Sequence, residues 1–189
     1  DMKKVRILLS QHIGAPATPI VAVGDEVKKG QLIANARGPI SANIYSSICG
    51  NVVAIEDIVN GLGQKQTHIV IENNGKDEQI LFDDIADLSP SSIIERIRLA
   101  GIVGLGGAGF PTAVKLTPKN QLDMLIINGA ECEPYLNCDY RLMIERTDDI
   151  YKGIKLIAKA LNVNTIKFGI EENKPLAIKA FEKYDDIEI

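Results

Sequence analysis

The spacing of apolar and polar residues changes partway along the chain. Before residue 75, short runs with the two-residue period of strands are separated by glycine and asparagine turns, which predicts a small β-domain. After it, apolar residues recur at helical spacing and alternate with short apolar strands, which predicts an α/β layer with a mainly parallel sheet. We therefore expect two domains, residues 1–75 and 76–189 of the 189-residue chain.

The second domain carries clear start and stop signals. Ser89 is a predicted N-cap and Pro90 a first helical residue, and Gly101 ends that helix. Its predicted inward face consists of Ile93, Ile94, Ile97 and Leu99. The elements expected next are a short helix over 111–116, a buried strand over 124–128, one long helix over 139–161, a strand over 165–170 and a helix after Pro175.

Composition and charge exclude several classes of protein. The net charge of -4 and the lack of Lys/Arg clusters argue against a nucleic-acid partner. The apolar runs fall far short of the roughly 20 residues that cross a bilayer, and no signal peptide opens the chain, so we expect a cytoplasmic protein. The three cysteines cannot ligate a four-cysteine cluster alone, and no metal site is predicted.

A glycine-rich segment, GIVGLGGAGFPT over residues 101–112, is the most informative stretch. Its glycines, among them Gly104, Gly106, Gly107 and Gly109, let the backbone approach a planar ligand or a phosphate. The helix predicted from residue 111 would favour an anion at its start, and Lys115 could reach the same charge. The spacing satisfies GxGxxG, but neither a leading strand nor a full helix flanks it, so a dinucleotide Rossmann site is not indicated. The alternative is a turn that only packs two elements together.

An acidic segment follows the predicted strand 124–128. It should lie at the carboxyl end of that strand, where open α/β sheets bind ligands. Asn128 can donate and accept hydrogen bonds, and Glu131 and Glu133 can accept them. Glu171 and Glu172 follow the next strand in the same position. A metal site or a merely solvated acidic loop is the alternative.

The first domain contains a motif without its usual modified residue. Residues 23–31 and 46–52 resemble the two halves of lipoyl and biotinyl domains, which fold as a barrel-sandwich hybrid. The stretch between them holds Arg37 but no lysine, so we expect a structural module without a covalent cofactor. Cys132 and Cys138 are interpreted as structural, and His12 and His68 as packing or surface residues.

These residues together resemble a known family. Residues 104–115 resemble the flavin loop GxGGAGFPTGxK of the FMN-binding subunit of respiratory complex I, 128–134 its NADEGEP segment, and Glu171-Glu172 its later GEE. A closer resemblance, over nearly the whole chain, is to the RnfC family of Rnf electron transport complexes and to the related cobalamin reductase of propanediol microcompartments.

The resemblance implies a fold and a set of site residues. The fold is an N-terminal barrel-sandwich hybrid followed by a truncated, Rossmann-like α/β domain that binds FMN. FMN would be held by eight residues: Gly104, Gly106, Gly107, Gly109, Lys115, Asn128, Glu131 and Glu171. NADH would face Phe110, Glu133 and Glu172, and no residue acts as a catalytic acid, base or nucleophile. Ala130 and Ile170 depart from the complex I pattern, which has Asp and Gly there.

The implied function is that of an NADH-dependent flavin oxidoreductase module. It passes electrons from NADH through FMN to iron–sulfur clusters that this chain does not contain, in a complex peripheral to the inner membrane. One alternative is cobalamin reduction inside a microcompartment, with shell proteins as partners. The other is an assembly module that docks on partner proteins and leaves its flavin pocket empty.

Overall fold

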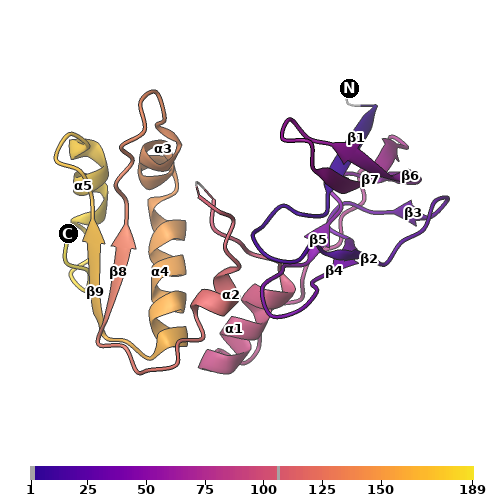
Figure 1. The fold of residues 1–189 in the computed structure, drawn as a ribbon. Coiled ribbons are helices and arrows are strands. Elements are labelled where there is room, and N and C mark those ends of the chain that lie inside the picture. The colour runs from indigo at the N-terminus through magenta and orange to yellow at the C-terminus, as the bar shows by residue number, and fades with distance from the viewer. Residues whose placement is uncertain (1–2, 106) are drawn as a thin grey trace. The chain divides into compact units, whose positions relative to one another are not determined.

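The computed structural model describes residues 3–105 and 107–189, which form two compact units. Unit 1 comprises the residues up to Ala86 together with Ile94–Lys115, and unit 2 comprises Asp87–Ile93 and Leu116–Ile189 (Figure 1). Each unit is described by itself. The predicted fold class, a barrel-sandwich hybrid followed by an α/β FMN-binding domain, is confirmed.

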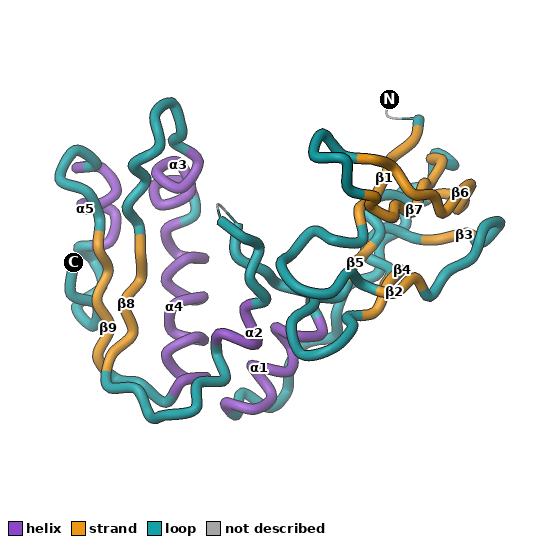
Figure 2. Tube along the Cα trace, viewed as in Figure 1, coloured by secondary structure: helices purple, strands orange, loops and turns teal. Residues whose placement is uncertain are grey.

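Unit 1 is built on two small antiparallel sheets. One has the strand order β1-β7-β6-β3 and the other β2-β4-β5. Long loops join these strands (Figure 2). Apolar residues that alternate along the strands, such as Ile7, Ile33, Val52, Ile69 and Ile71, form its core. The strands are β1 Lys4–Leu8, β2 Thr18–Pro19, β3 Glu26–Val27, β4 Leu32–Asn35, β5 Ile44–Tyr45, β6 Gly50–Val59 and β7 Lys65–Asn73.

Helix α1, Pro90–Leu99, begins and ends where the sequence predicts. The Ser92 N–H donates to the Ser89 hydroxyl at 3.4 Å, as expected of an N-cap. Gly101 has φ +64°, the left-handed conformation that commonly ends a helix. The predicted inward position of Leu99 is wrong, since its side chain is 44% exposed. Six residues after the buried Ile93, it lies about 120° around the helix from that side chain.

Unit 2 is a helix-covered pair of parallel strands. Strands β8, Met124–Asn128, and β9, Thr165–Gly169, pair in parallel with Met124 opposite Thr165 and Asn128 opposite Gly169. They lie side by side in Figure 1. Helices α3 Cys138–Glu145, α4 Thr147–Leu161 and α5 Pro175–Phe181 share one core with β9. The predicted parallel arrangement is therefore confirmed.

Two predictions about unit 2 are wrong. The single helix expected over 139–161 is two helices, because Arg146 leaves the helical conformation with φ -127° and ψ 32°. Asp148 and Asp149 then lie in the first turn of α4, where the helix dipole favours acidic residues. Strand β8 is not buried either, since Ile126 is 68% exposed. The core helices cover only the face that carries Leu125 and Ile127.

Candidate functional site

The glycine-rich segment folds back on itself as a β-hairpin. The Gly104 N–H donates to the Phe110 carbonyl at 2.9 Å, and the Thr112 N–H donates to the Ile102 carbonyl at 2.9 Å. Val103 and Pro111 form an antiparallel bridge between them. Leu105, Gly107, Ala108 and Gly109 thus belong to the tip of the hairpin, and Gly106, also predicted to bind FMN, lies outside the described residues.

The tip leaves its backbone accessible to a ligand. A Cβ atom added at Gly107 would meet nothing within 4 Å, and one at Gly104 would meet only backbone atoms of Phe110 at 3.8 Å. A hollow of about 480 Å³ adjoins the tip, lined by residues 10–13 and by Gly104, Leu105, Gly107, Ala108 and Gly109. Ligand pockets span roughly 300–1,000 Å³, so the hollow and the glycine backbone on one of its walls suit a flat ring or a phosphate.

Lys115 supplies the positive charge near this hairpin. It ends helix α2, Thr112–Lys115, which has only four residues. So short a helix has a small dipole, so the ammonium group is the stronger attraction for an anion. Lys115 is exposed and forms no ion pair within the described part of the chain. Phe110, predicted to face NADH, is half-buried.

In unit 2, the carboxyl ends of β8 and β9 bring the two acidic segments together. The Gly129 N–H donates to the Gly169 carbonyl at 2.8 Å, which extends the strand pairing by one residue. The Glu131 N–H donates to a Glu171 carboxylate oxygen at 3.5 Å. The Asn128 side-chain oxygen accepts from the Ala130 N–H at 3.0 Å, so its amide nitrogen is the group that can donate to a ligand. The predicted juxtaposition of Asn128, Glu131 and Glu171 is thus observed.

The Glu131 carboxylate is already engaged within the protein. Its oxygens accept from the backbone N–H groups of Asp139 at 3.0 Å and Tyr140 at 3.3 Å. It therefore caps helix α3, whose N-cap residue Asn137 makes no side-chain cap bond. The bond from the Asp139 amide holds the pKa of Glu131 below its usual range. Sequence reasoning missed this role because the cap lies seven residues before the helix.

Cys138 is bonded to the same carboxylate. Its thiol donates to Glu131 at 3.2 Å, and this bond raises the pKa of the thiol. A raised pKa disfavours the reactive thiolate, in line with the structural role predicted for this cysteine. Glu131, Cys138 and Asp139 lie close enough together to share a cation. The Glu131 oxygens accept from two helix amides and from the Cys138 thiol, so their position is explained by these bonds without a cation.

The remaining predicted residues are exposed. Glu133 and Glu172 lie on loops at the carboxyl ends of the strands and are open to solvent. Tyr135, which the sequence did not single out, is fully exposed and has φ +66°, a strained backbone conformation for a side chain of this size. Residues 10–13, which line the hollow, were not predicted as site residues either, because His12 was interpreted as a packing or surface residue.

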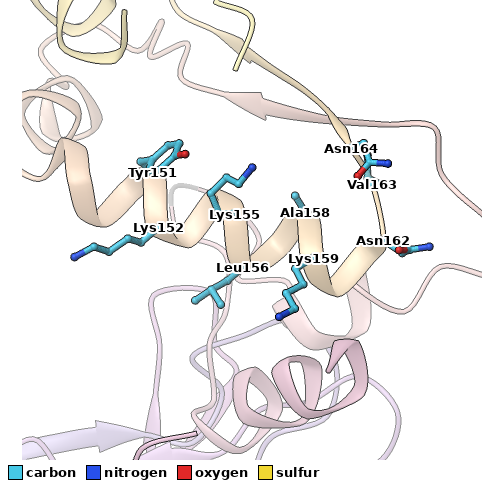
Figure 3. Close-up of a pocket in the computed structure, with 9 residues that line it drawn as sticks. All are labelled: Tyr151, Lys152, Lys155, Leu156, Ala158, Lys159, Asn162, Val163 and Asn164. Atoms are coloured by element: carbon cyan, nitrogen blue, oxygen red, sulfur yellow. The ribbon is translucent and has the colours of Figure 1, made fainter. Parts of the chain in front are cut away.

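A larger hollow in unit 2 has no connection with the predicted residues. It has a volume of about 700 Å³ and is lined by α4 and the turn that follows it. Figure 3 shows that Lys152, Lys155 and Lys159 project from α4 in different directions rather than toward one point. Lys155 is also paired with Asp186 at 2.6 Å. This surface therefore does not form a focused anion site.

Comparisons with known families define the class of the protein. Residues 1–76 match the model described as the RnfC barrel sandwich hybrid domain, and residues 97–188 match the Nuo51 FMN-binding domain. The chain thus joins a barrel-sandwich domain to an FMN-binding domain. Among the described residues, no helix is both long enough and apolar enough to span a bilayer.

Individual relatives place the chain more narrowly. It is 51% identical over 187 residues to the C subunit of the proton-translocating ferredoxin:NAD(+) oxidoreductase complex of Clostridium ljungdahlii, covering 95% of this chain and 41% of the relative. It is 47% identical over 188 residues to the C subunit of the ion-translocating oxidoreductase complex of Rhodobacter capsulatus, covering 96% and 36%. For the C subunit of the Na(+)-translocating complex of Acetobacterium woodii, the identity is 40% over 185 residues, covering 95% and 42%.

The chain belongs to this RnfC family. It spans about two fifths of the length of the relatives from Clostridium ljungdahlii and Acetobacterium woodii.

Proposed function

We propose that this chain binds FMN and takes part in electron transfer from NADH to iron–sulfur centres of an Rnf-type complex. The observation that carries the proposal is the glycine hairpin, which presents open backbone and an adjoining hollow within a region that matches an FMN-binding domain. Bound FMN would supply the redox chemistry, since a flavin accepts a hydride from a nicotinamide and releases electrons singly. The protein's own task is to bind and orient.

The surroundings of the described residues permit the predicted roles in part. Gly104 and Gly107 let the backbone approach the cofactor, Gly106 and Gly109 stay predicted ligands, and the exposed ammonium of Lys115 attracts the phosphate of FMN. Asn128 and Glu171 of unit 2 stay predicted FMN ligands, since the amide nitrogen of Asn128 is able to donate a hydrogen bond and the Glu171 carboxylate to accept one. Glu131 contributes by holding the segment that connects β8 to α3, because its oxygens are used there.

The nicotinamide nucleotide would be oriented by Phe110, Glu133 and Glu172. An aromatic face can stack on a flat ring, and carboxylates can accept bonds from ribose hydroxyl groups. None of these groups must gain or lose a proton for hydride transfer. The protein therefore needs no general acid or base.

Assembly into a larger complex is supported by the relatives, which are subunits of proton- or Na(+)-translocating complexes. We propose that this chain functions with other subunits of such a complex, on the cytoplasmic side of the inner membrane. The two exposed cysteines, Cys132 and Cys138, are too few for a four-cysteine cluster, and Cys49 is buried. The iron–sulfur centres would therefore be supplied by residues outside the printed sequence.

The test of cofactor binding is a titration of the purified chain with FMN, followed by flavin fluorescence. Gly107→Val places side-chain atoms where the ligand would lie but meets no protein atom at its Cβ, so the chain should fold and bind FMN at least about tenfold more weakly. Gly61→Val, in the turn after β6, is the matched control, because its Cβ also meets nothing within 4 Å. Equal affinity in both variants would refute the proposed site.

Charge and substrate are tested separately. Lys115→Ala should weaken FMN binding about tenfold, whereas Lys119→Ala, another exposed lysine, should not. NADH should bleach the visible absorbance of the bound flavin. Glu133→Gln and Glu172→Gln should slow that bleaching at low NADH without changing FMN affinity. If the protein binds FMN but NADH does not reduce it, the proposal that NADH is the electron donor is refuted and the proposal that FMN is the cofactor stands.

A further inference from the structure

The barrel-sandwich domain contacts the glycine hairpin at two places, the base where the hairpin begins and the tip. At the base, the Leu99 carbonyl accepts from the Asn43 side-chain amide at 3.2 Å and from the Tyr45 hydroxyl. Gly101 lies so close to this strand that an added Cβ would be 2.3 Å from the Asn43 carbonyl oxygen. The hairpin therefore starts from a fixed point on the barrel.

At the tip of the hairpin, the contact is between two backbone segments. The Ile13 N–H donates to the Gly109 carbonyl at 3.3 Å. Gly109 has φ +65°, and an added Cβ would lie 3.0 Å from both the Gln11 carbonyl oxygen and the His12 Cα. The tip of the hairpin thus rests on the chain between Gln11 and Ile13.

His12 fixes this part of the barrel. Its imidazole is 7% exposed, and Nε2 accepts from the Ala42 N–H at 3.1 Å. Because a neutral imidazole that accepts at one nitrogen carries its proton on the other, Nδ1–H donates to the Ile13 carbonyl at 3.1 Å. One side chain therefore links Ala42 of the barrel to Ile13, whose own N–H holds Gly109.

The same segment forms part of the ligand hollow. Ser10, Gln11, His12 and Ile13 line it together with the glycine tip. A ligand that lies on the glycines would therefore also lie against the barrel. A shift of Ile13 would change both the shape of this hollow and the position of Gly109.

We propose that His12 is a positioning residue for the FMN site, and that the barrel-sandwich domain acts through it to hold the glycine hairpin in its binding conformation. This inference rests on the proposed function. It gives the barrel domain a direct part in flavin binding. His12 acts through its bond to the Ile13 carbonyl, and its bond to Ala42 anchors the ring.

Two variants separate the two bonds of His12. His12→Asn places an amide N–H where Nδ1–H lies, so it keeps the bond to Ile13 and should bind FMN within about threefold of the unchanged protein. His12→Gln places its carbonyl oxygen near the Nε2 position, so it keeps the bond to Ala42 and loses the bond to Ile13. We expect about tenfold weaker FMN binding, the size of effect that follows from losing one buried hydrogen bond.

The other histidine provides the control. His68 Nδ1 bonds to the Gln66 carbonyl at 2.8 Å on strand β7, away from the hairpin contacts. His68→Gln should leave FMN affinity unchanged. Equal losses in His12→Asn and His12→Gln, or no loss in His12→Gln, would overturn the positioning role.

Amide hydrogen exchange tests the inference without any cofactor. In ligand-free His12→Gln, the amides of Ile13 and Gly104, which donate to the Gly109 and Phe110 carbonyls, should exchange faster than in the unchanged protein, while β6 and β7 keep their protection. In His12→Asn, this increase should be smaller, because the bond to Ile13 is kept. Unchanged exchange at Ile13 and Gly104 in His12→Gln would overturn the inference even if FMN binds. If the unchanged protein binds no FMN, the proposed function fails, and the exchange result still decides whether His12 holds the hairpin.

Discussion

Gly129 lies where two strands and a helix leave no room for a side chain. A Cβ added there would be 2.6 Å from Cε2 of Phe168, 3.1 Å from the Gly169 carbonyl oxygen and 3.1 Å from Sδ of Met143. Phe168 is 3% exposed and packs edge-on against Phe181 with ring centroids 4.8 Å apart. It cannot move aside without disturbing the core. We therefore expect Gly129→Ala to destabilise unit 2 by about 2 kcal/mol, within the usual range for overpacking.

The loss can be measured by urea denaturation followed by tyrosine fluorescence. The chain has no tryptophan, and of its five tyrosines only Tyr45 lies in unit 1, so the signal reports mainly on unit 2. For a denaturant slope of about 2 kcal/mol/M, the unfolding midpoint should fall by about 1 M. The slope itself should stay the same, because the variant changes packing and not the surface exposed on unfolding.

A control and a double variant make the test specific. Gly153, inside α4, has no atom within 4 Å of an added Cβ, so Gly153→Ala should stabilise the same unit by about 0.5–1 kcal/mol. Phe168→Leu removes the Cε2 atom that the new Cβ would meet. The double variant Gly129→Ala with Phe168→Leu should therefore lose about 1 kcal/mol less stability than the sum of the two single losses. A Gly129→Ala protein within about 0.5 kcal/mol of the unchanged protein, or strictly additive losses, would refute this account of the packing.

Three further outcomes follow from the contacts described above. The Asp139 amide lowers the folded-state pKa of Glu131, so the stability that this carboxylate contributes should be complete above the unfolded-state pKa and disappear as pH falls through the lower folded-state pKa. Urea unfolding at a series of acidic pH values should therefore show a smaller loss of stability in Glu131→Gln than in the unchanged protein. The same variant should speed alkylation of Cys138, whose thiol pKa is raised by that carboxylate, as measured by mass spectrometry of the labelled peptide. Gly101→Ala should lower the melting temperature of unit 1 sharply, because φ is +64° and the Cβ would lie 2.3 Å from the Asn43 oxygen; an unchanged melting temperature would contradict that geometry.

Local signals account for most of the elements that the sequence predicts correctly. Helix α1 begins after Ser89 and ends before Gly101 because capping and left-handed glycine depend only on neighbouring residues. The bounds of β8 also agree with the prediction, since five successive residues fit a strand between turns. Its burial does not, because an apolar run reveals nothing about how many faces are covered.

The sequence predicts which residues lie at the ends of the strands, but it does not predict which contacts the candidate site residues make. Parallel pairing of β8 and β9 brings Glu131 to Glu171, as their places after two strands indicate. By contrast, the hairpin of the glycine segment depends on backbone bonds such as that between Gly104 and Phe110, which leave no pattern among side chains. The contact of Gly109 with Ile13 joins residues 96 positions apart, so no local rule could have indicated it.

Strand β8, which has one exposed face and one unpaired edge within the described residues, affects how the protein behaves in solution. Within the described residues it pairs only with β9, so its other edge offers a row of unpaired peptide groups beside the exposed side chain of Ile126. An open edge of this kind, without a lysine or proline among its five residues, is a template for strands of other molecules. Concentrated samples of this chain should therefore self-associate through β8, and Ile126→Lys should keep them monomeric while leaving the helix-covered core intact.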